Sequence, residues 1–123
     1  GEGWTLNVPL PAGTDASEYR QHFSHGLEQA LETCRPEFIL ISAGFDVMAG
    51  DPLGGMLLEP KDLHALTREV MAGAAAEPRQ DDVRGDVRKV GVVATLEGGY
   101  DPGRTGLGAA AVLRALAGID GLD

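Results

Sequence analysis

The sequence predicts an α/β protein with a three-layer α/β/α arrangement and a parallel sheet, on three observations. Short apolar runs rich in β-branched residues alternate with longer segments whose apolar residues recur every three or four positions. The connections between the runs are long enough to hold a helix, which favours parallel strands joined by crossovers. Two of the runs end in glycine-rich turns that carry polar side chains. About three strands and three helices would leave sheet edges open, so we expect an incomplete piece of a larger sheet.

The first half of the chain predicts a strand, a helix and a second strand. We expect a short strand over residues 5–10. Thr14 or Asp15 can cap a helix that ends near Cys34, with one apolar face. The apolar run at 38–41 follows, and because it is unbroken we expect a strand buried on both faces.

The second half predicts a long loop, two helices and a third strand. The loop spans about 44–59, and Pro60 suits the first position of the helix that follows it. Residues 77–89 are strongly polar and predict a solvated loop. The third strand is expected at 90–96, and the last helix is expected to end near Gly118.

Length, composition and charge narrow the class of protein. The chain has 123 residues, 43% of them hydrophobic, which is enough for one globular domain. A net charge of −9 argues against a nucleic-acid-binding surface, and no apolar run approaches the roughly 20 residues that cross a bilayer. The single cysteine, Cys34, rules out an internal disulfide and favours a reducing compartment: the cytoplasm, with the nucleus left open. Because the chain begins with glycine, we expect a piece of a longer or processed protein; its oligomeric state stays open.

Two polar residues follow predicted strands and are candidate site residues. Asp46 is the first charged residue after the second strand, and Tyr100 lies just beyond the third. In parallel sheets both loops emerge at the carboxyl edge, where ligands bind. A carboxylate oxygen suits a cation such as Zn²⁺, and a phenol can donate to an oxyanion formed beside it. The alternatives are a turn-capping Asp46 and a Tyr100 that packs on the sheet edge and bonds to a backbone carbonyl.

Other candidates have simpler structural interpretations. Asp51, followed by Pro52, is expected to bond backbone amides and hold the long loop in one shape, while Leu53 lines a pocket or fills the core. The three histidines are expected at the surface: His22, His25 and His64. The glycine-rich run at 103–108 suggests a phosphate site only weakly, because it matches no phosphate-binding motif.

Two stretches together resemble the histone deacetylase family in its broad sense, which includes acetoin-utilisation proteins and acetylpolyamine amidohydrolases. They are S-A-G-F-D-V-M-A-G-D-P-L-G-G at 42–55 and L-E-G-G-Y-D at 96–101. The opening G-E-G-W-T-L-N-V-P-L is similar to the segment that leads into this half of the family domain. The resemblance covers residues 1–123 as the C-terminal part of one deacetylase-like domain, with 77–89 as a charged surface insertion.

The resemblance implies roles for individual residues. Asp46 matches the last zinc ligand, and Tyr100 matches the tyrosine that hydrogen-bonds the substrate carbonyl. The glycines lining the acyl channel correspond to Gly98 and Gly99, and Leu53 stands at the channel mouth. A glutamate at the mouth is associated with polyamine substrates, so leucine favours acyl-lysine or another neutral-flanked amide.

The resemblance also implies cofactors and leaves gaps. The main-chain carbonyl of Trp4 would help to bind a structural monovalent cation such as K⁺. Arginases share the fold with two metals, but Met48 replaces their second aspartate, which favours one zinc ion. The tandem histidines and the D-x-H motif of the family match nothing in this chain, and the usual A-H after Asp46 is Val47-Met48. We expect a zinc-dependent amide hydrolase acting on acetylated lysine or a related amine, completed by upstream chain and inactive as this piece alone. The alternative is a non-catalytic lobe that binds partners or small acyl ligands.

Overall fold

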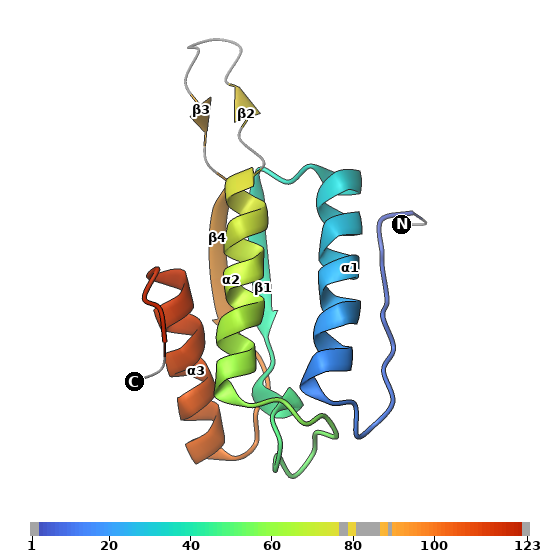
Figure 1. The fold of residues 1–123 in the computed structure, drawn as a ribbon, viewed down its shortest axis with the longest axis vertical. Coiled ribbons are helices and arrows are strands. Elements are labelled where there is room, and N and C mark those ends of the chain that lie inside the picture. Colours follow the sequence, from blue (N-terminus) through green and yellow to red (C-terminus); the bar gives the residue numbers. More distant parts are fainter. Residues whose placement is uncertain (1–2, 77–78, 81–86, 89, 122–123) are drawn as a thin grey trace.

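The computed structural model describes residues 3–76, 79–80, 87–88 and 90–121. Three helices and two strands form the body of the molecule, and two very short strands project from it (Figure 1). In chain order the elements are α1 (Ala16–Cys34), β1 (Phe38–Ala43), the 3-10 turn η1 (Phe45–Val47), α2 (Pro60–Ala76), β2 (Arg79–Gln80), β3 (Val87–Arg88), β4 (Gly91–Leu96) and α3 (Pro102–Leu116).

The parallel sheet is made by β1 and β4, which pair from Phe38 with Gly91 to Ala43 with Leu96. The crossover between them contains α2, so the α/β class with a parallel sheet is confirmed. Because the strands are parallel, the loops that follow them leave at the same edge. The N–H of Glu97 still donates to the carbonyl of Ala43 at 2.9 Å, so the pairing continues into both loops.

The helices begin at capping residues that the sequence contains. Asp15 caps α1, and its Oδ1 accepts the N–H of Glu18 at 2.9 Å. The other candidate cap, Thr14, is buried and donates its hydroxyl to the carbonyl of Pro11 instead. Pro60 opens α2, and Pro102 opens α3 directly after its cap, Asp101.

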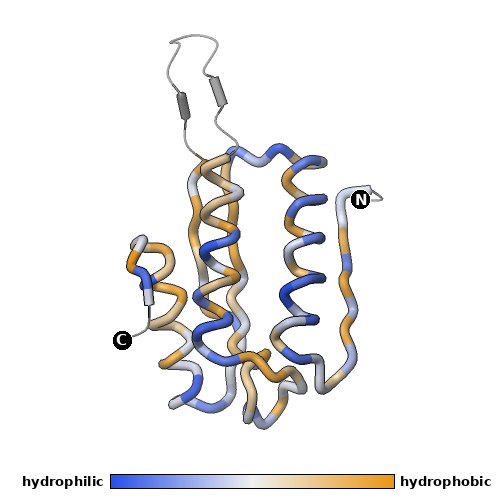
Figure 2. Tube along the Cα trace, in the orientation of Figure 1, coloured by the Kyte–Doolittle hydropathy of each residue, from blue (hydrophilic) through white to orange (hydrophobic). Residues whose placement is uncertain are grey.

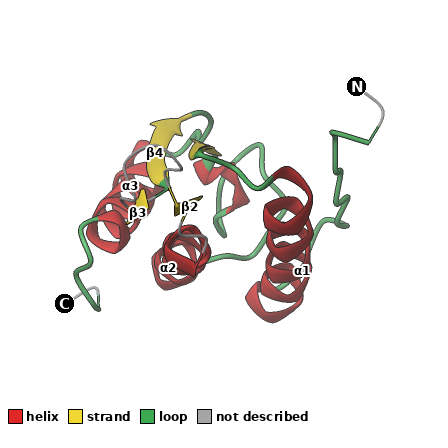
Figure 3. Cartoon of the chain, turned by 90° about the horizontal axis from the view of Figure 1, so that it is seen from above, coloured by secondary structure: helices red, strands yellow, loops and turns green. Residues whose placement is uncertain are grey.

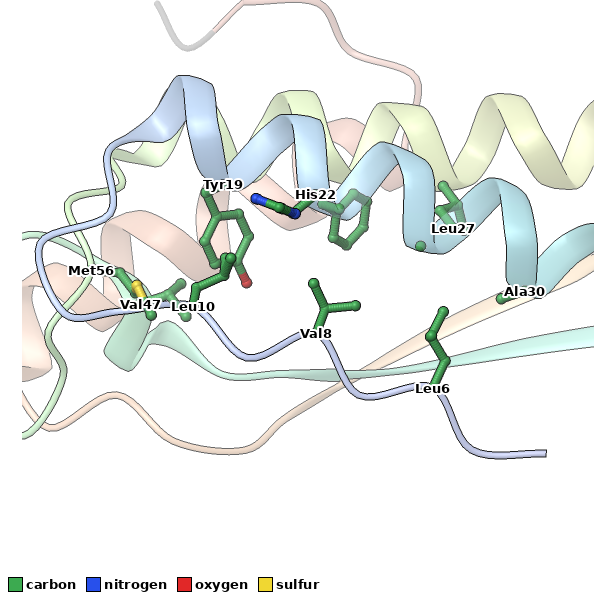
Figure 4. Close-up of a pocket in the computed structure, with 11 residues that line it drawn as sticks. Leu6, Val8, Leu10, Tyr19, His22, Leu27, Ala30, Val47 and Met56 are labelled. Atoms are coloured by element: carbon green, nitrogen blue, oxygen red, sulfur yellow. The ribbon is translucent and has the colours of Figure 1, made fainter. Parts of the chain in front are cut away.

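The strand expected at 5–10 is wrong. This segment is extended but makes no strand, and it runs beside α1 and away from the β1–β4 pair (Figure 1). Pro9 has no N–H to donate to a ladder. The apolar side chains of Leu6, Val8 and Leu10 instead line a groove of about 430 Å³ against α1 (Figure 4). The apolar pattern predicted correctly that the segment is extended, but it did not predict that the segment packs on α1 and not on a strand.

The expectation that the strand at 38–41 is buried on both faces is also wrong within the described residues. The helices cover one face of the β1–β4 pair, and no helix lies over the other (Figure 3). Phe38 is 56% and Leu40 62% exposed, in alternation with half-buried neighbours. The hydrophobic colouring nevertheless continues along both strands (Figure 2). The burial of a strand depends on the elements that pack against it, and the sequence of the strand itself does not specify them.

The polar stretch at 77–89 is more ordered in part than the expected loop. Arg79–Gln80 and Val87–Arg88 pair as antiparallel strands. Strands of two residues are too short to give an alternating pattern in the sequence. The rest of the predicted insertion, 77–78, 81–86 and 89, lies outside the described residues.

The hydrophobic core lies at the loop end of the sheet. Met48 and Leu58 are its most buried members, at 0% and 1% exposure. They belong to the loop between β1 and α2 and pair as a β-bridge. The remaining buried residues of the cluster come from η1, α2 and α3: Phe45, Leu63, Leu66 and Val112. The core therefore forms the support beneath the loop that carries Asp46.

Candidate functional site at the carboxyl end of the sheet

The segment 44–46 places Asp46 at the end of β1. Gly44 is extended, and Phe45 begins a single 3-10 turn. The ring of Phe45 is buried in the core. The N–H of Phe45 donates to the carbonyl of Gly98 at 3.3 Å, so the turn that carries Asp46 is bonded to the loop after β4. Asp46 itself is half-buried.

Glycines surround the Asp46 carboxylate. A Cβ at Gly98 would lie 2.8 Å from Asp46 Oδ2, and one at Gly44 would lie 3.0 Å from Oδ1. Gly98 also has φ +102°, a region that L residues rarely adopt. A side chain at either position would press on the carboxylate, so both glycines leave room for it.

The loop 50–55 folds back over the main chain of Asp46. A Cβ at Gly54 would lie only 1.6 Å from the Asp46 carbonyl oxygen. Leu53, the preceding residue, is 73% exposed, so the alternative in which it fills the core is wrong. Pro52 is also exposed.

Asp51 connects the two loops. Its Oδ1 accepts the N–H groups of Leu53 and Gly54 at 2.8 and 3.0 Å, and its Oδ2 accepts the N–H of Tyr100 at 2.7 Å. Burial acts to raise the pKa of this carboxyl, but N–H donors from Tyr100, Leu53, Gly54 and Asp101 outweigh it, so the pKa of Asp51 lies below its ordinary value. The sequence predicted that Asp51 accepts hydrogen bonds from amides of its own loop. The hydrogen bond from the Tyr100 N–H could not be predicted from the sequence.

Tyr100 follows two glycines with positive φ, and its side chain faces solvent. It is 54% exposed, whereas the glycine before it is tightly enclosed. A Cβ at Gly99 would lie 2.5 Å from the Thr105 hydroxyl and 2.8 Å from Phe45 Cβ. The loop 97–100 therefore passes close to both η1 and α3 because it has no side chains there.

Two further side chains near these loops were not singled out from the sequence as site residues. Burial raises the pKa of the Tyr19 hydroxyl on α1, and the negative charge of Asp46 raises it further. Arg104 on α3 pairs with Glu59 across the loops, Nη2 to Oε2 at 2.9 Å. Neither relation has a signal in one sequence, because the partners are far apart along the chain.

The other predicted positions lie away from the two loops or have packing roles. Trp4 is exposed within the N-terminal segment, and His22 and His25 are exposed on α1. His64 is half-buried, with Nε2 2.9 Å from the carbonyl of Ile119. Gly108 lies inside α3, where a Cβ would meet Phe45 and Met48, and Asp101 caps the helix by accepting the N–H of Arg104. Gly108 thus serves helix packing, and the described residues give no support for a phosphate site.

The fold and the site together define an α/β protein with a carboxylate and an exposed phenol on glycine-rich loops at one edge of the sheet. Residues 1–116 match the model of the histone deacetylase domain, and the chain belongs to this family. It is 34% identical to a probable deacetylase of Archaeoglobus fulgidus over 98% of this chain and 31% of the relative. It is 35% identical to a histone deacetylase-like amidohydrolase of Pseudomonas aeruginosa over 97% of this chain and 29% of the relative.

Solved structures agree with this family. The HD domain of HDA15 superposes with a TM-score of 0.74 at 29% identity, over 93% of this chain and 28% of that one. The histone deacetylase Clr3 gives a TM-score of 0.73 at 29% identity, over 94% of this chain and 17% of that one. The chain therefore spans less than a third of the length of each of these proteins.

Proposed function

We propose that the chain is the C-terminal part of a zinc-dependent deacetylase domain that removes acetyl or other acyl groups from lysine-type or related amines. The observation that carries the proposal is the setting of Asp46. Its carboxylate lies between Gly44 and Gly98 at the carboxyl edge of a parallel sheet, on a turn bonded to the loop of Tyr100. This arrangement occurs in a chain of the histone deacetylase family.

The residues of this chain fit only part of a zinc site. Across the described ranges, no three side chains of His, Cys, Asp or Glu gather closely enough to hold a metal. Asp46 offers one oxygen donor, and a zinc site in proteins needs three or four protein ligands. The other ligands would come from chain outside this one. Met48, where arginases have a second aspartate, is fully buried in the core, which supports a single metal.

Zinc in such a site would polarise the substrate carbonyl and make a bound water acidic. The remaining work falls to residues of this chain. The Tyr100 hydroxyl would donate a hydrogen bond to the oxygen of that carbonyl as negative charge develops on it. The main chain of Gly98 and Gly99 would line the acyl channel, and exposed Leu53 would stand at its mouth, where a neutral side chain suits acyl-lysine. The Trp4 carbonyl would contribute to a monovalent cation site.

The proposal extends to the cellular compartment of the protein. Within the described residues, no helix combines the length and hydropathy that crossing a membrane requires. Cys34 is free and exposed, which suits a reducing compartment. We place the protein in the cytoplasm, with the nucleus as the alternative.

The test compares Asp46→Asn with Asp62→Asn in the full-length protein. Both replace a carboxylate by an amide, but the Asp62 carboxylate accepts the N–H of Glu59 at the start of α2, within its own segment. We expect Asp46→Asn to abolish bound zinc and hydrolysis of acetyl-lysine peptides, while Asp62→Asn retains both. A wild-type protein that binds no zinc and hydrolyses no acyl-amine would favour the rival class, a non-catalytic lobe that binds partners or small acyl ligands.

A further inference from the structure

We propose that Asp51 is a positioning residue for Tyr100: its carboxylate holds the main chain of the phenol-bearing loop against the loop that carries Leu53. The inference rests on the proposed function, because it assigns Asp51 a part in the same reaction. It goes beyond holding one loop in shape, since the two loops are 49 residues apart in sequence.

The two carboxylate oxygens serve different loops. Oδ1 accepts Leu53 and Gly54 from its own loop, while Oδ2 accepts Tyr100 from the other. Only 8% of Asp51 is exposed, so these amides take the place of water. An ionised carboxylate accepts on both oxygens and donates on neither, and bonds from backbone N–H groups to it are stronger than neutral ones. The lowered pKa of Asp51 agrees with this ionised, amide-bonded state.

The loop before Tyr100 has little stiffness of its own. Gly98 and Gly99 both have positive φ and no side chain with which to anchor the loop, so the segment is held by its close packing and by main-chain bonds such as that from the Phe45 N–H to the Gly98 carbonyl. After Tyr100 the chain enters the cap of α3, where Asp101 accepts the N–H of Arg104 at 2.8 Å. Between these points, the N–H groups of Tyr100 and Asp101 bond to Asp51, so this carboxylate helps to fix where the Tyr100 main chain, and with it the phenol, lies.

A displaced phenol would affect turnover more than substrate binding. Tyr100 would donate to charge that develops only during the reaction, and an interaction of this kind raises kcat and not ground-state affinity. A misplacement of about 1 Å can lower a rate by about 100-fold. Loss of the Asp51 bond should therefore lower kcat and leave KM nearly unchanged.

The experiment uses Asp51→Asn, with Asp62→Asn as the matched control, in the full-length protein. Asparagine has one acceptor oxygen, so its NH₂ group must face either Tyr100 or the Leu53–Gly54 amides. We expect faster hydrogen exchange at the Tyr100 amide and a kcat lower by about 10- to 100-fold for an acetyl-lysine peptide, with KM within about three-fold. Asp62→Asn should change neither.

A double-mutant cycle separates positioning from general loosening. If Asp51 acts through the phenol, Asp51→Asn should lower kcat by less than about three-fold in a Tyr100→Phe background. Equal losses in both backgrounds would overturn the proposal, as would unchanged exchange at the Tyr100 amide. Should Asp51→Asn fail to fold, an ester in place of the Gly99–Tyr100 amide removes the Tyr100 N–H while keeping the Asp51 carboxylate, and it must also lower kcat. A wild-type protein without hydrolytic activity would refute the proposed function, whereas the exchange measurement would still decide whether Asp51 holds Tyr100.

Discussion

The two loops at the carboxyl end of the sheet are built in opposite ways. The loop between β1 and α2 supplies three of the most buried residues of the molecule, Phe45, Met48 and Leu58. The loop between β4 and α3 is short, contains two glycines with positive φ and ends in an exposed tyrosine. The loop between β1 and α2 is part of the hydrophobic core, whereas the loop between β4 and α3 is held in place by hydrogen bonds and close packing against its neighbours.

This difference assigns a separate task to each loop. Because the long loop is packed, it gives Asp46 the firm support that its proposed role as a metal ligand requires. Because the short loop has no side chains at Gly98 and Gly99, it can approach Asp46 closely and still present Tyr100 outward. The position of the short loop then depends on the long one, through Asp51 and through the Phe45–Gly98 bond.

The largest expected effect comes from adding one methyl group to the long loop. In Gly54→Ala, the new Cβ would lie 1.6 Å from the Asp46 carbonyl oxygen. Backbone must move to relieve the clash, so we expect a loss of more than about 3 kcal/mol in the free energy of unfolding, beyond ordinary overpacking. Denaturant unfolding measures it. The control is Gly106→Ala in α3, where the new Cβ would meet nothing within 4 Å outside its own helical backbone and neighbours, and the helix should gain about 0.5–1 kcal/mol.

Removing a core side chain of the long loop should have the next largest effect. Leu58 is 1% exposed, so Leu58→Ala is expected to lower the free energy of unfolding by about 2–5 kcal/mol. Leu113→Ala, on the exposed face of α3, should change it by less than about 0.5 kcal/mol. Similar losses from the two substitutions would mean that the long loop is not part of the core.

Acidification should weaken the connection between the loops. The pKa of Asp51 is lower in the folded than in the unfolded protein, so its contribution to stability is complete above the unfolded pKa of about 3.9 and is lost as pH falls through the folded pKa. The stability difference between wild type and Asp51→Asn should therefore be constant near neutral pH and shrink below about pH 4. Urea unfolding at several pH values measures it; a difference that grows on acidification would contradict the lowered pKa.

The smallest effect is expected at the ion pair that spans the loops on the outside. Glu59 and Arg104 are partly exposed, so Glu59→Gln should lower the free energy of unfolding by no more than about 1 kcal/mol. The loss should decrease at high salt, because salt screens exposed charges. A large loss that salt does not change would show that this pair, and not Asp51, is the main connection.

The sequence predicted those features that depend on neighbouring residues. The starts of α1 and α2 were close because Asp15 and Pro60 are local signals. The strand at 91–96 was likewise placed to within one residue, because its apolar, β-branched run is bounded by turn residues.

Features that depend on distant partners could not be predicted. The segment at 5–10 has strand-like residues but lies beside α1, and Phe38 and Leu40 are exposed because nothing in the described chain covers their face. The Asp51–Tyr100 bond and the effect of Asp46 on Tyr19 join residues far apart in sequence, for which one sequence holds no pattern. Asp46 and Tyr100 themselves were selected because topology brings the ends of parallel strands to one edge.

The most direct test of the account is the hydroxyl of Tyr100 in the full-length protein. Tyr100→Phe removes that one oxygen, and Tyr19→Phe removes the oxygen of the other tyrosine of the chain. We predict that Tyr100→Phe keeps its zinc and its KM for an acetyl-lysine peptide but loses about 100-fold or more in kcat, while Tyr19→Phe stays near wild type. A Tyr100→Phe protein that turns over within two-fold of wild type would contradict the account.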